Sequence, residues 1–373
     1  MNELAERVSL LLKPVWRGVE AALVEGMGEN PRCRLGRFAL RGGQGTPPAA
    51  VVVRHAKPGA RAVFGEWAAT RFLTRHHPVP GIGPGFLAGD EAAGLLVVED
   101  IGPADERLGR VLQGDDAAAA TRGLVELCRT LARLHAGSMG LMGEYRAVAA
   151  AVGPLEPTHH RANTLAEGLD ALPGLCASLG YPVPPAAARE LDEAKGPLLD
   201  PGPLLAFTHG DATPLNAHYS RGRVRLVDFE SGGWRNALVD GSYPRLRYLH
   251  TSWAGAIPPA LRREAERAYR ETLAEGCPAA GDDGLYHTAH VACAAAWTAG
   301  LCAFIPRVLH EDEMWNIASR RARILCGLED FADLAEEYRR LPALAEFCRG
   351  LNGLLREKWG GPAGLPLYAA LAR

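Results

Sequence analysis

Three oxygen-bearing side chains, Asp211, Asn216 and Asp228, are spaced in a way that suits the transfer of a phosphoryl group. Asp211 and Asn216 lie in the stretch HGDATPLN, and Asp228 follows twelve residues after the asparagine in VDFE. An acceptor hydroxyl must lose its proton in such a reaction, and a carboxylate on a loop can take it. Mg²⁺ prefers oxygen ligands, so the Asn216 amide oxygen and the Asp228 carboxylate are suitable metal ligands.

The segment between these residues predicts how they converge. NAHYS and RVRLVDF have strand character and are separated by the short turn RG, which indicates a tight hairpin whose two ends share one rim. Other interpretations remain open at this point. Asp211 could simply support a turn before Pro214, and a partly buried Asp228 could be neutralised by an arginine instead of a metal. A metal-dependent hydrolase built on His209 and Asp211 would need further histidines that the segment lacks.

The elements before this segment predict a β-rich front. Leucine and valine spacing favours an amphipathic helix over residues 3–25. Strands are expected at 37–40 and 50–54, because consecutive valines at the second site favour a buried pleated strand. A helix over 62–76 follows, and then a hairpin whose second strand is 95–99.

The rest of the chain is mainly helical in pattern. Leucines at helical spacing predict a helix over about 117–137, and two short helices are expected within 150–200. Strand character returns over 204–230, and helices are expected from 245 onward. A β-rich front and a helix-rich remainder predict a two-lobed α+β protein.

Composition narrows the classes of partner and compartment. The chain has 373 residues, a formal net charge of −2 and 47% hydrophobic residues, so bulk charge gives no reason to expect a nucleic-acid partner. Eight scattered cysteines without a CxxC pair indicate buried free thiols in a reducing compartment. The first eighteen residues are too polar for a signal peptide or a membrane span, so we expect a cytoplasmic protein with no membrane partner.

The motif HGD-x4-N followed by VDFE resembles the catalytic and metal-binding loops of the aminoglycoside phosphotransferase/choline kinase-like family, whose members are relatives of protein kinases. LARLHA at 131–136 is similar to the helix before the catalytic segment in that family, and LLVVEDIG at 95–102 looks like its interlobe hinge. The resemblance covers about residues 33–250.

The resemblance implies a bilobal protein-kinase-like fold. A small β-rich N-terminal lobe would span residues 1–101 and end in the hinge, and a larger, mainly helical C-terminal lobe would span 102–373 and carry the acceptor site. The implied activity is an ATP- or GTP-dependent and Mg²⁺-dependent transfer of the γ-phosphate to a hydroxyl of a small molecule such as an aminoglycoside, choline or a sugar. Asp211 would be the catalytic base, and Asn216 and Asp228 would hold Mg²⁺.

The same resemblance implies a set of nucleotide-binding residues. Arg54 stands where the family usually has a lysine that contacts the phosphates, and Lys57 is the alternative cation. Glu66 matches the helix glutamate that braces this cation. Glu99 and Ile101 lie in the hinge, where an adenine docks on backbone groups. Arginine keeps the positive charge and can bind phosphate with two N–H groups.

The glycines of RGGQGTPP form the predicted phosphate loop, because Gly42, Gly43 and Gly45 let backbone N–H groups approach phosphates closely. The alternative is an ordinary hairpin turn. In the C-terminal lobe, acidic residues could face a cationic acceptor or simply lie on the surface. These residues are Asp282, Asp283, Glu311, Asp312 and Glu313.

The arginine in the lysine position also leaves a second class of function open. A catalytically impaired pseudokinase would keep the fold and serve as a nucleotide-binding or partner-binding module. The intact Asp211, Asn216 and Asp228 favour the enzyme.

Overall fold

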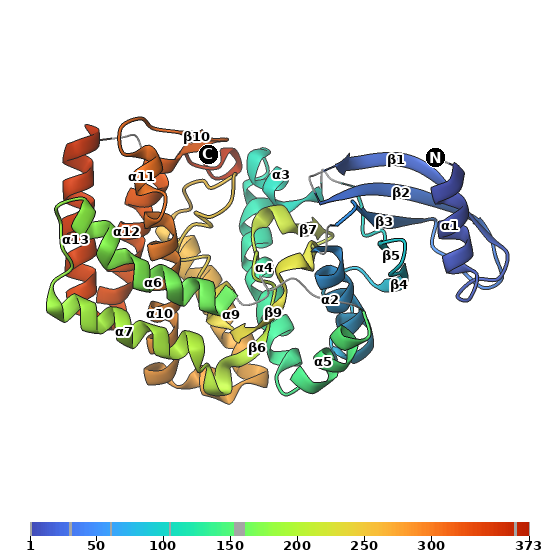
Figure 1. Ribbon diagram of the computed structural model, residues 1–373, viewed down its shortest axis with the longest axis horizontal. Coiled ribbons are helices and arrows are strands. Elements are labelled where there is room, and N and C mark those ends of the chain that lie inside the picture. The colour runs from blue at the N-terminus through green and yellow to red at the C-terminus, as the bar shows by residue number, and fades with distance from the viewer. Residues whose placement is uncertain are drawn as a thin grey trace.

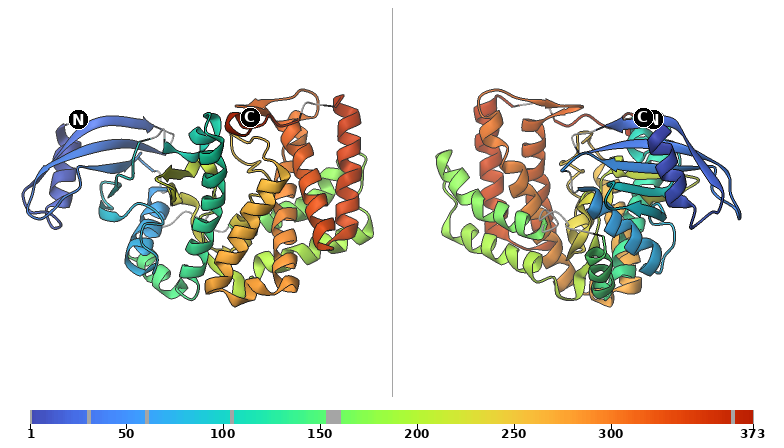
Figure 2. Two further views of the ribbon diagram at one scale, coloured as in Figure 1. Left: turned by 180° about the vertical axis from the view of Figure 1, so that it is seen from behind. Right: turned by 45° about the vertical axis from the view of Figure 1, so that its right-hand side comes forward.

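The structure is a computed structural model that describes residues 2–29, 32–59, 62–103, 106–152, 161–361 and 364–372. Figure 1 shows a β-sheet lobe at one end and a helical lobe at the other, with α4 (Ala117–Ser138) between them. The two views in Figure 2 agree that the sheet and α13 (Pro342–Trp359) lie at opposite ends of the molecule. The predicted α+β architecture with a β-rich N-terminal lobe is therefore confirmed.

The N-terminal lobe is built on one antiparallel sheet of five strands in the order β1-β2-β3-β5-β4. Side chains alternate across β5, so Leu95 and Val97 pack under α1, whereas Leu96 and Val98 join the core shared with α2. Both faces of this interior strand are therefore buried. The elements of the lobe are α1 (Asn2–Leu12), β1 (Val19–Glu29), β2 (Cys33–Gly42), β3 (Ala50–Ala56), α2 (Ala62–His76), β4 (Phe86–Asp90) and β5 (Leu95–Glu99).

The prediction of one helix over residues 3–25 is wrong in its second half. The helix ends at Leu12, and residues from Val19 onward form the edge strand β1, which pairs with β2. Pro14 has no N–H to continue the helix, and Gly18 has a φ of +80° that turns the chain into the strand. The helix predicted over 62–76 is confirmed at Ala62–His76.

The helical lobe has a core made of close-packed helices. α4 packs along α9 (Pro259–Gly276), and α10 (Asp283–Cys302) is buried along most of its length against helices on several sides. Its many alanines allow this close approach. The remaining helices are α3 (Leu108–Gln113), α5 (Met142–Ala150), α6 (Arg161–Ser178), α7 (Pro185–Leu199), α8 (Leu238–Gly241), α11 (Ile305–Val308) and α12 (Arg320–Tyr338).

Two pairs of short strands lie between the lobes. β6 (Leu205–Thr208) pairs with β9 (Gly233–Asn236), and β7 (Ala217–Ser220) pairs with β8 (Arg223–Leu226). The segments that follow β6 and β8 contain Asp211, Asn216 and Asp228. The β7–β8 turn has positive φ at Arg221 and Gly222, which suits a two-residue hairpin. The predicted hairpin is confirmed. A third pair, β10 (Met314–Trp315) and β11 (Ala318–Ser319), lies far from it in sequence.

Two further findings concern the chain as a whole. All eight cysteines are buried and none forms a disulfide, as the sequence predicts. Among the described residues, no helix combines the length and apolar character needed to cross a bilayer.

Gly89 on β4 is a test of the packing between the sheet and α2. A Cβ atom at this position would lie 2.3 Å from the Trp67 ring. We expect Gly89→Ala to lower the free energy of unfolding by about 1–3 kcal/mol, because Trp67 is buried and must shift. The matched control is Gly143→Ala in α5, where the new Cβ meets no atom within 4 Å and should stabilise the helix. Urea denaturation measures both. Equal unfolding free energies would contradict the tight packing.

Candidate active site

The loop between β6 and β7 brings Asp211 and Asn216 into direct contact. The Asn216 side-chain N–H group donates to the Asp211 carboxylate at 2.9 Å and to the Asp211 carbonyl at 3.0 Å. A single 3₁₀ turn, Pro214–Asn216, folds the loop back so that this is possible. Because the Asn216 nitrogen is used on Asp211, its amide oxygen is the atom left for another partner.

Asp228 is fixed next to this loop through the residue before it. The Val227 N–H donates to the Asn216 carbonyl at 2.9 Å, and His209 Nε2 lies 2.8 Å from the Val227 carbonyl. Asp228 itself has φ 67° and ψ 54°, a left-handed conformation that aspartate adopts more readily than most residues. Its side chain is 34% exposed. The loop and the end of β8 therefore place all three predicted residues together.

Arg54 links the sheet lobe to this group. Its Nε lies 2.6 Å from Glu66 Oε2 on α2, and its Nη2 donates to Asp228 Oδ1 at 3.0 Å. Burial pushes the pKa of Glu66 upward, and the Arg54 guanidinium opposes that rise by favouring the carboxylate. Burial likewise disfavours the Arg54 cation, but Glu66 and Asp228 outweigh it and raise the Arg54 pKa. One guanidinium thus holds two carboxylates from different lobes.

Lys57 points elsewhere. Its ammonium lies 2.5 Å from Glu29 at the end of β1, and its side chain is 29% exposed. Of the two cations considered from the sequence, Arg54 therefore occupies the position beside Glu66 and Asp228. The same end of the sheet approaches the helical lobe through Arg32, which pairs with Glu230 at 2.8 Å.

The predicted phosphate loop lies away from Arg54 and Asp228. It consists of Gly42, Gly43 and Gly45. β2 and β3 are antiparallel, and Arg54 pairs with Leu35, seven residues before Gly42. At about 3.3 Å per residue, Gly42 lies about 23 Å along the strand from Leu35. Gly43 instead lies against Trp16 and Val19, where a Cβ would come within 3.3–3.5 Å.

The prediction that these three glycines cover phosphates is therefore wrong. The connection nearest to Arg54 is the one between β1 and β2, and residues 30 and 31 of it lie outside the described residues. Sequence reasoning missed it because residues 19–25 were assigned to a helix. The signal was the pair Gly26 and Gly28 near the end of β1, where the pairing with β2 shifts register.

The predicted hinge follows β5, and its residues Glu99 and Ile101 differ in whether their side chains are already bound within the protein. The Glu99 carboxylate is bound by Arg225 at 2.6 and 2.7 Å, and this hydrogen bonding lowers its pKa. The Glu99 side chain is thus committed to the protein. Ile101 is half-buried two residues later. Nucleotide contacts at this hinge are expected from its backbone.

Two residues near the hinge were missed by sequence reasoning. His218 on β7 is paired by a backbone bridge with Arg107, and its ring lies close to Gly102. Burial, aided by Arg107, lowers the pKa of His218 to about 4, so the ring is neutral. Arg107 is close enough to Asp228 for the two charges to interact, and its Nε is buried without a hydrogen-bond partner among the described residues. Neither residue forms a motif in the sequence.

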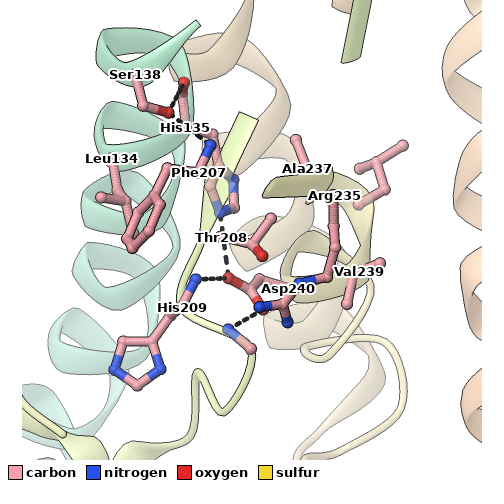
Figure 3. Close-up of polar contacts among 12 residues, drawn as sticks. Leu134, His135, Ser138, Phe207, Thr208, His209, Arg235, Ala237, Val239 and Asp240 are labelled. Atoms are coloured by element: carbon pink, nitrogen blue, oxygen red, sulfur yellow. Dashed lines mark hydrogen bonds and ion pairs between the residues drawn. The ribbon is translucent and has the colours of Figure 1, made fainter. Parts of the chain in front are cut away.

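A buried carboxylate, that of Asp240, holds the backbone of the loop that leads to Asp211 (Figure 3). Asp240 accepts hydrogen bonds from the backbone N–H groups of His209 at 2.6 Å and Gly210 at 3.0 Å, and His135 lies 3.2 Å away. Burial alone would raise the pKa of Asp240, but the His135 hydrogen bond and nearby positive groups lower it. Gly210 has a φ of +77° and leaves no room for a Cβ beside Arg235. These contacts commit both oxygens of Asp240 to holding the loop.

The predicted acidic residues of the C-terminal lobe have local partners. Asp283 pairs with Arg270, Asp282 caps the start of α10, and Glu313 pairs with Arg307 and Arg320. Asp312 also accepts backbone N–H groups from Glu313 at 2.8 Å and Arg321 at 3.2 Å, so four of the five acids have local structural contacts.

The donor atoms fit a hard divalent cation. The Asn216 amide oxygen and the second oxygen of Asp228 are the kind of ligand that Mg²⁺ accepts, and Mg²⁺ takes few protein ligands when it also binds phosphates. Among the described residues, no group of three or more His, Cys, Asp or Glu side chains could hold a metal by itself. Any such site here depends on Asn216 and on oxygens from a ligand.

Asp240→Asn tests the support of the loop. An amide in place of the carboxylate presents N–H groups toward backbone N–H donors, so at least one buried donor loses its acceptor. We expect a loss of about 1–3 kcal/mol in the free energy of unfolding, measured with urea. The control is Asp333→Asn, an exposed partner of Arg349, which should change stability by about 0.5 kcal/mol or less. Equal effects of the two variants would contradict the bracing role.

Comparisons with known proteins place this chain in a family. No curated protein is significantly similar to the chain in sequence. Solved structures with a similar chain path include a choline kinase from Cryptosporidium parvum (14% identity, 95% of this chain, 98% of that chain, TM-score 0.47). A choline/ethanolamine kinase family protein from Mesorhizobium loti has 18% identity, 91% and 98% coverage and a TM-score of 0.40. An aminoglycoside phosphotransferase bound to streptomycin and ATP has 11% identity, 92% and 97% coverage and a TM-score of 0.47. The sequence profile described as the phosphotransferase enzyme family matches residues 37–279. Because that match spans more than half of the chain, the chain belongs to the phosphotransferase enzyme family.

Proposed function

We propose that this protein transfers the γ-phosphoryl group of ATP or GTP, in the presence of Mg²⁺, to a hydroxyl group of a small molecule. The observation that carries the proposal is the joint placement of Asp211, Asn216 and Asp228 beside the Arg54–Glu66 ion pair. Family membership supports the reaction class. None of the eight cysteines forms a disulfide, which fits work in a reducing compartment such as the cytoplasm.

Asp211 is the proposed catalytic base. The hydrogen bond from Asn216 orients its carboxylate, and the Asp211 N–H donates to His209 Nδ1 at 3.2 Å. An acceptor hydroxyl placed beside the carboxylate would give up its proton as the bond to phosphorus forms. The loop is fixed before substrate arrives, so little of the catalytic geometry must be created during the reaction.

Asn216 and Asp228 are the proposed ligands of Mg²⁺, which would neutralise negative charge on the phosphates. Arg54 is the proposed phosphate-binding cation. Its Nε and Nη2 are used on Glu66 and Asp228, and its Nη1 is the donor group proposed for a phosphate oxygen. An arginine in place of lysine therefore keeps the bracing contact and one donor for a phosphate. This arrangement favours the enzyme over an impaired pseudokinase.

The acceptor would bind on the helical lobe. The streptomycin- and choline-related names of the structural neighbours are consistent with hydroxyl acceptors of different kinds. The protein's own acceptor is best sought with a panel that includes aminoglycosides, choline-like amines, sugars and amino-acid alcohols, following the release of ADP or GDP.

Asp211→Asn tests the catalytic base. Loss of the base should lower kcat by about 10²–10⁴-fold, because general-base catalysis contributes on that order. Nucleotide affinity, measured by calorimetry with Mg²⁺, should stay close to that of the unaltered protein. If the unaltered protein binds Mg²⁺–nucleotide but releases no ADP or GDP with any acceptor in the panel, the binding-module alternative replaces the enzyme.

Arg54→Met and Lys57→Met test which cation contacts the phosphates. Arg54→Met should raise the KM for nucleotide by about 10-fold or more, since it removes a charge-assisted contact. It should also lower stability, because Glu66 is left buried without its cation. Arg54→Lys keeps the charge, so its nucleotide KM and its stability should lie between those of Arg54→Met and those of the unaltered protein.

Lys57→Met is the matched loss of charge on the same strand end, and it should leave the nucleotide KM nearly unchanged. A larger effect at Lys57 than at Arg54 would reverse the assignment. Steady-state kinetics and thermal unfolding of the three variants supply the comparison.

A further inference from the structure

Glu99 and Arg225 form an ion pair that joins two functionally different segments. Arg225 lies on β8 and Glu99 is the last residue of β5. Arg225 Nη1 donates to Glu99 Oε1 at 2.7 Å, and Nη2 donates to Oε2 at 2.6 Å. Two parallel bonds between a planar guanidinium and a carboxylate fix orientation as well as distance. The pair therefore connects the hinge of the sheet lobe rigidly to a strand of the helical lobe.

The same two side chains hold the loop that precedes β4. Arg225 Nη2 also donates to the Gly83 carbonyl at 2.6 Å, and the Gly85 N–H donates to Glu99 Oε2 at 3.0 Å. The loop lies directly on the helical lobe, because a Cβ at Gly83 would come within 2.6 Å of the Phe229 ring. Three segments thus meet at one ion pair.

The Arg225–Glu99 pair lies close in sequence both to the hinge and to Asp228, so it can affect the spacing between them. Glu99 stands two residues before Ile101 in the hinge, and Arg225 stands three residues before Asp228. A shift of either segment relative to the other would change the distance between the base-binding end and the metal-binding end of a nucleotide site. On the other side of the hinge, Arg37 binds Asp100 at 2.7 Å. That second contact holds the hinge to the sheet only.

The surroundings of the pair argue against a role in stability alone. Glu99 and Arg225 line a cavity of about 1030 Å³, and their side chains are 38% and 27% exposed. Exposed ion pairs contribute little to folding because water screens them. The geometry that they fix is the larger effect.

We propose that the Arg225–Glu99 ion pair is a positioning device that sets the hinge and the Asp228 loop at one spacing, so that the base and the phosphates of a nucleotide are bound together. This inference rests on the proposed function, since it concerns the nucleotide site of that reaction. Arg225 and Glu99 touch no nucleotide in this proposal and act through the backbone that they hold.

A double-mutant cycle tests it. Arg225→Gln and Glu99→Gln should each raise the Kd for Mg²⁺–ATP or Mg²⁺–GTP by about 10-fold, and the double variant should lose no more than either single one, because both remove the same contact. The control is Arg349→Gln, which breaks exposed pairs with Asp333 and Glu336 between α12 and α13. That control should leave the Kd unchanged.

A second readout separates positioning from stability and does not need nucleotide. Hydrogen exchange at the Gly85 amide, which donates to Glu99, should speed up in Arg225→Gln and Glu99→Gln and stay unchanged in Arg349→Gln. Should a glutamine variant fail to fold, Arg225→Lys keeps the charge without the two-pronged contact and should show an intermediate loss.

Folded variants with unchanged Kd overturn the proposal, as do single losses that multiply in the double variant. A Kd loss that follows only the loss of thermal stability, without faster exchange at Gly85, also overturns it. If the unaltered protein binds no nucleotide, the proposed function fails instead. In that case, faster Gly85 exchange in the two variants would still show the pair holding the hinge.

Discussion

The fully buried carboxylate of Asp240 is the interaction on which the candidate active site depends. A charge without solvent must be matched by donors, and here two of them are backbone N–H groups of the loop that carries Asp211. The third partner of the Asp240 carboxylate is the ring of His135 on α4. The other nitrogen of that ring bonds to the Tyr269 hydroxyl on α9. The loop is therefore tied to α4 and α9, and these contacts with the core help to fix its shape.

Three arginines make polar contacts between the sheet lobe and the segments that carry the candidate site. Arg54 joins Glu66 to Asp228, Arg225 joins β8 to the hinge, and Arg32 joins the first hairpin region to Glu230. Each is a directional contact between a guanidinium and a carboxylate, and each crosses between segments that are distant in sequence. These polar contacts cross between the lobes beside the candidate site, and a continuous apolar core that includes Phe72 on α2 and Phe207 on β6 also joins the lobes.

Sequence reasoning recovered the parts of this arrangement that are local. HGD-x4-N and VDFE lie within twenty-two residues, and the turn between their strands is short, so their convergence follows from the hairpin alone. It failed where long-range pairing decided the outcome. The stretch VEAALVEG has apolar residues that fit a helix as well as a strand, and only its pairing with β2 selects the strand. Because of that error, the glycines between β2 and β3 were the ones predicted to cover phosphates. Arg107, His218 and Arg225 carry no motif, and their roles come from tertiary contacts.

Cys33 begins β2 beside the charged group formed by Arg54, Glu66 and Asp228, and it is buried. Burial raises the pKa of its thiol, and the neighbouring carboxylates add to that rise. Since the thiolate is the form that reacts with alkylating reagents, Cys33 is protected both sterically and electrostatically while the sheet end stays closed. Modification of Cys33 by iodoacetamide would therefore require that this end of the sheet open, so the rate of that modification would measure such an opening without an engineered cysteine.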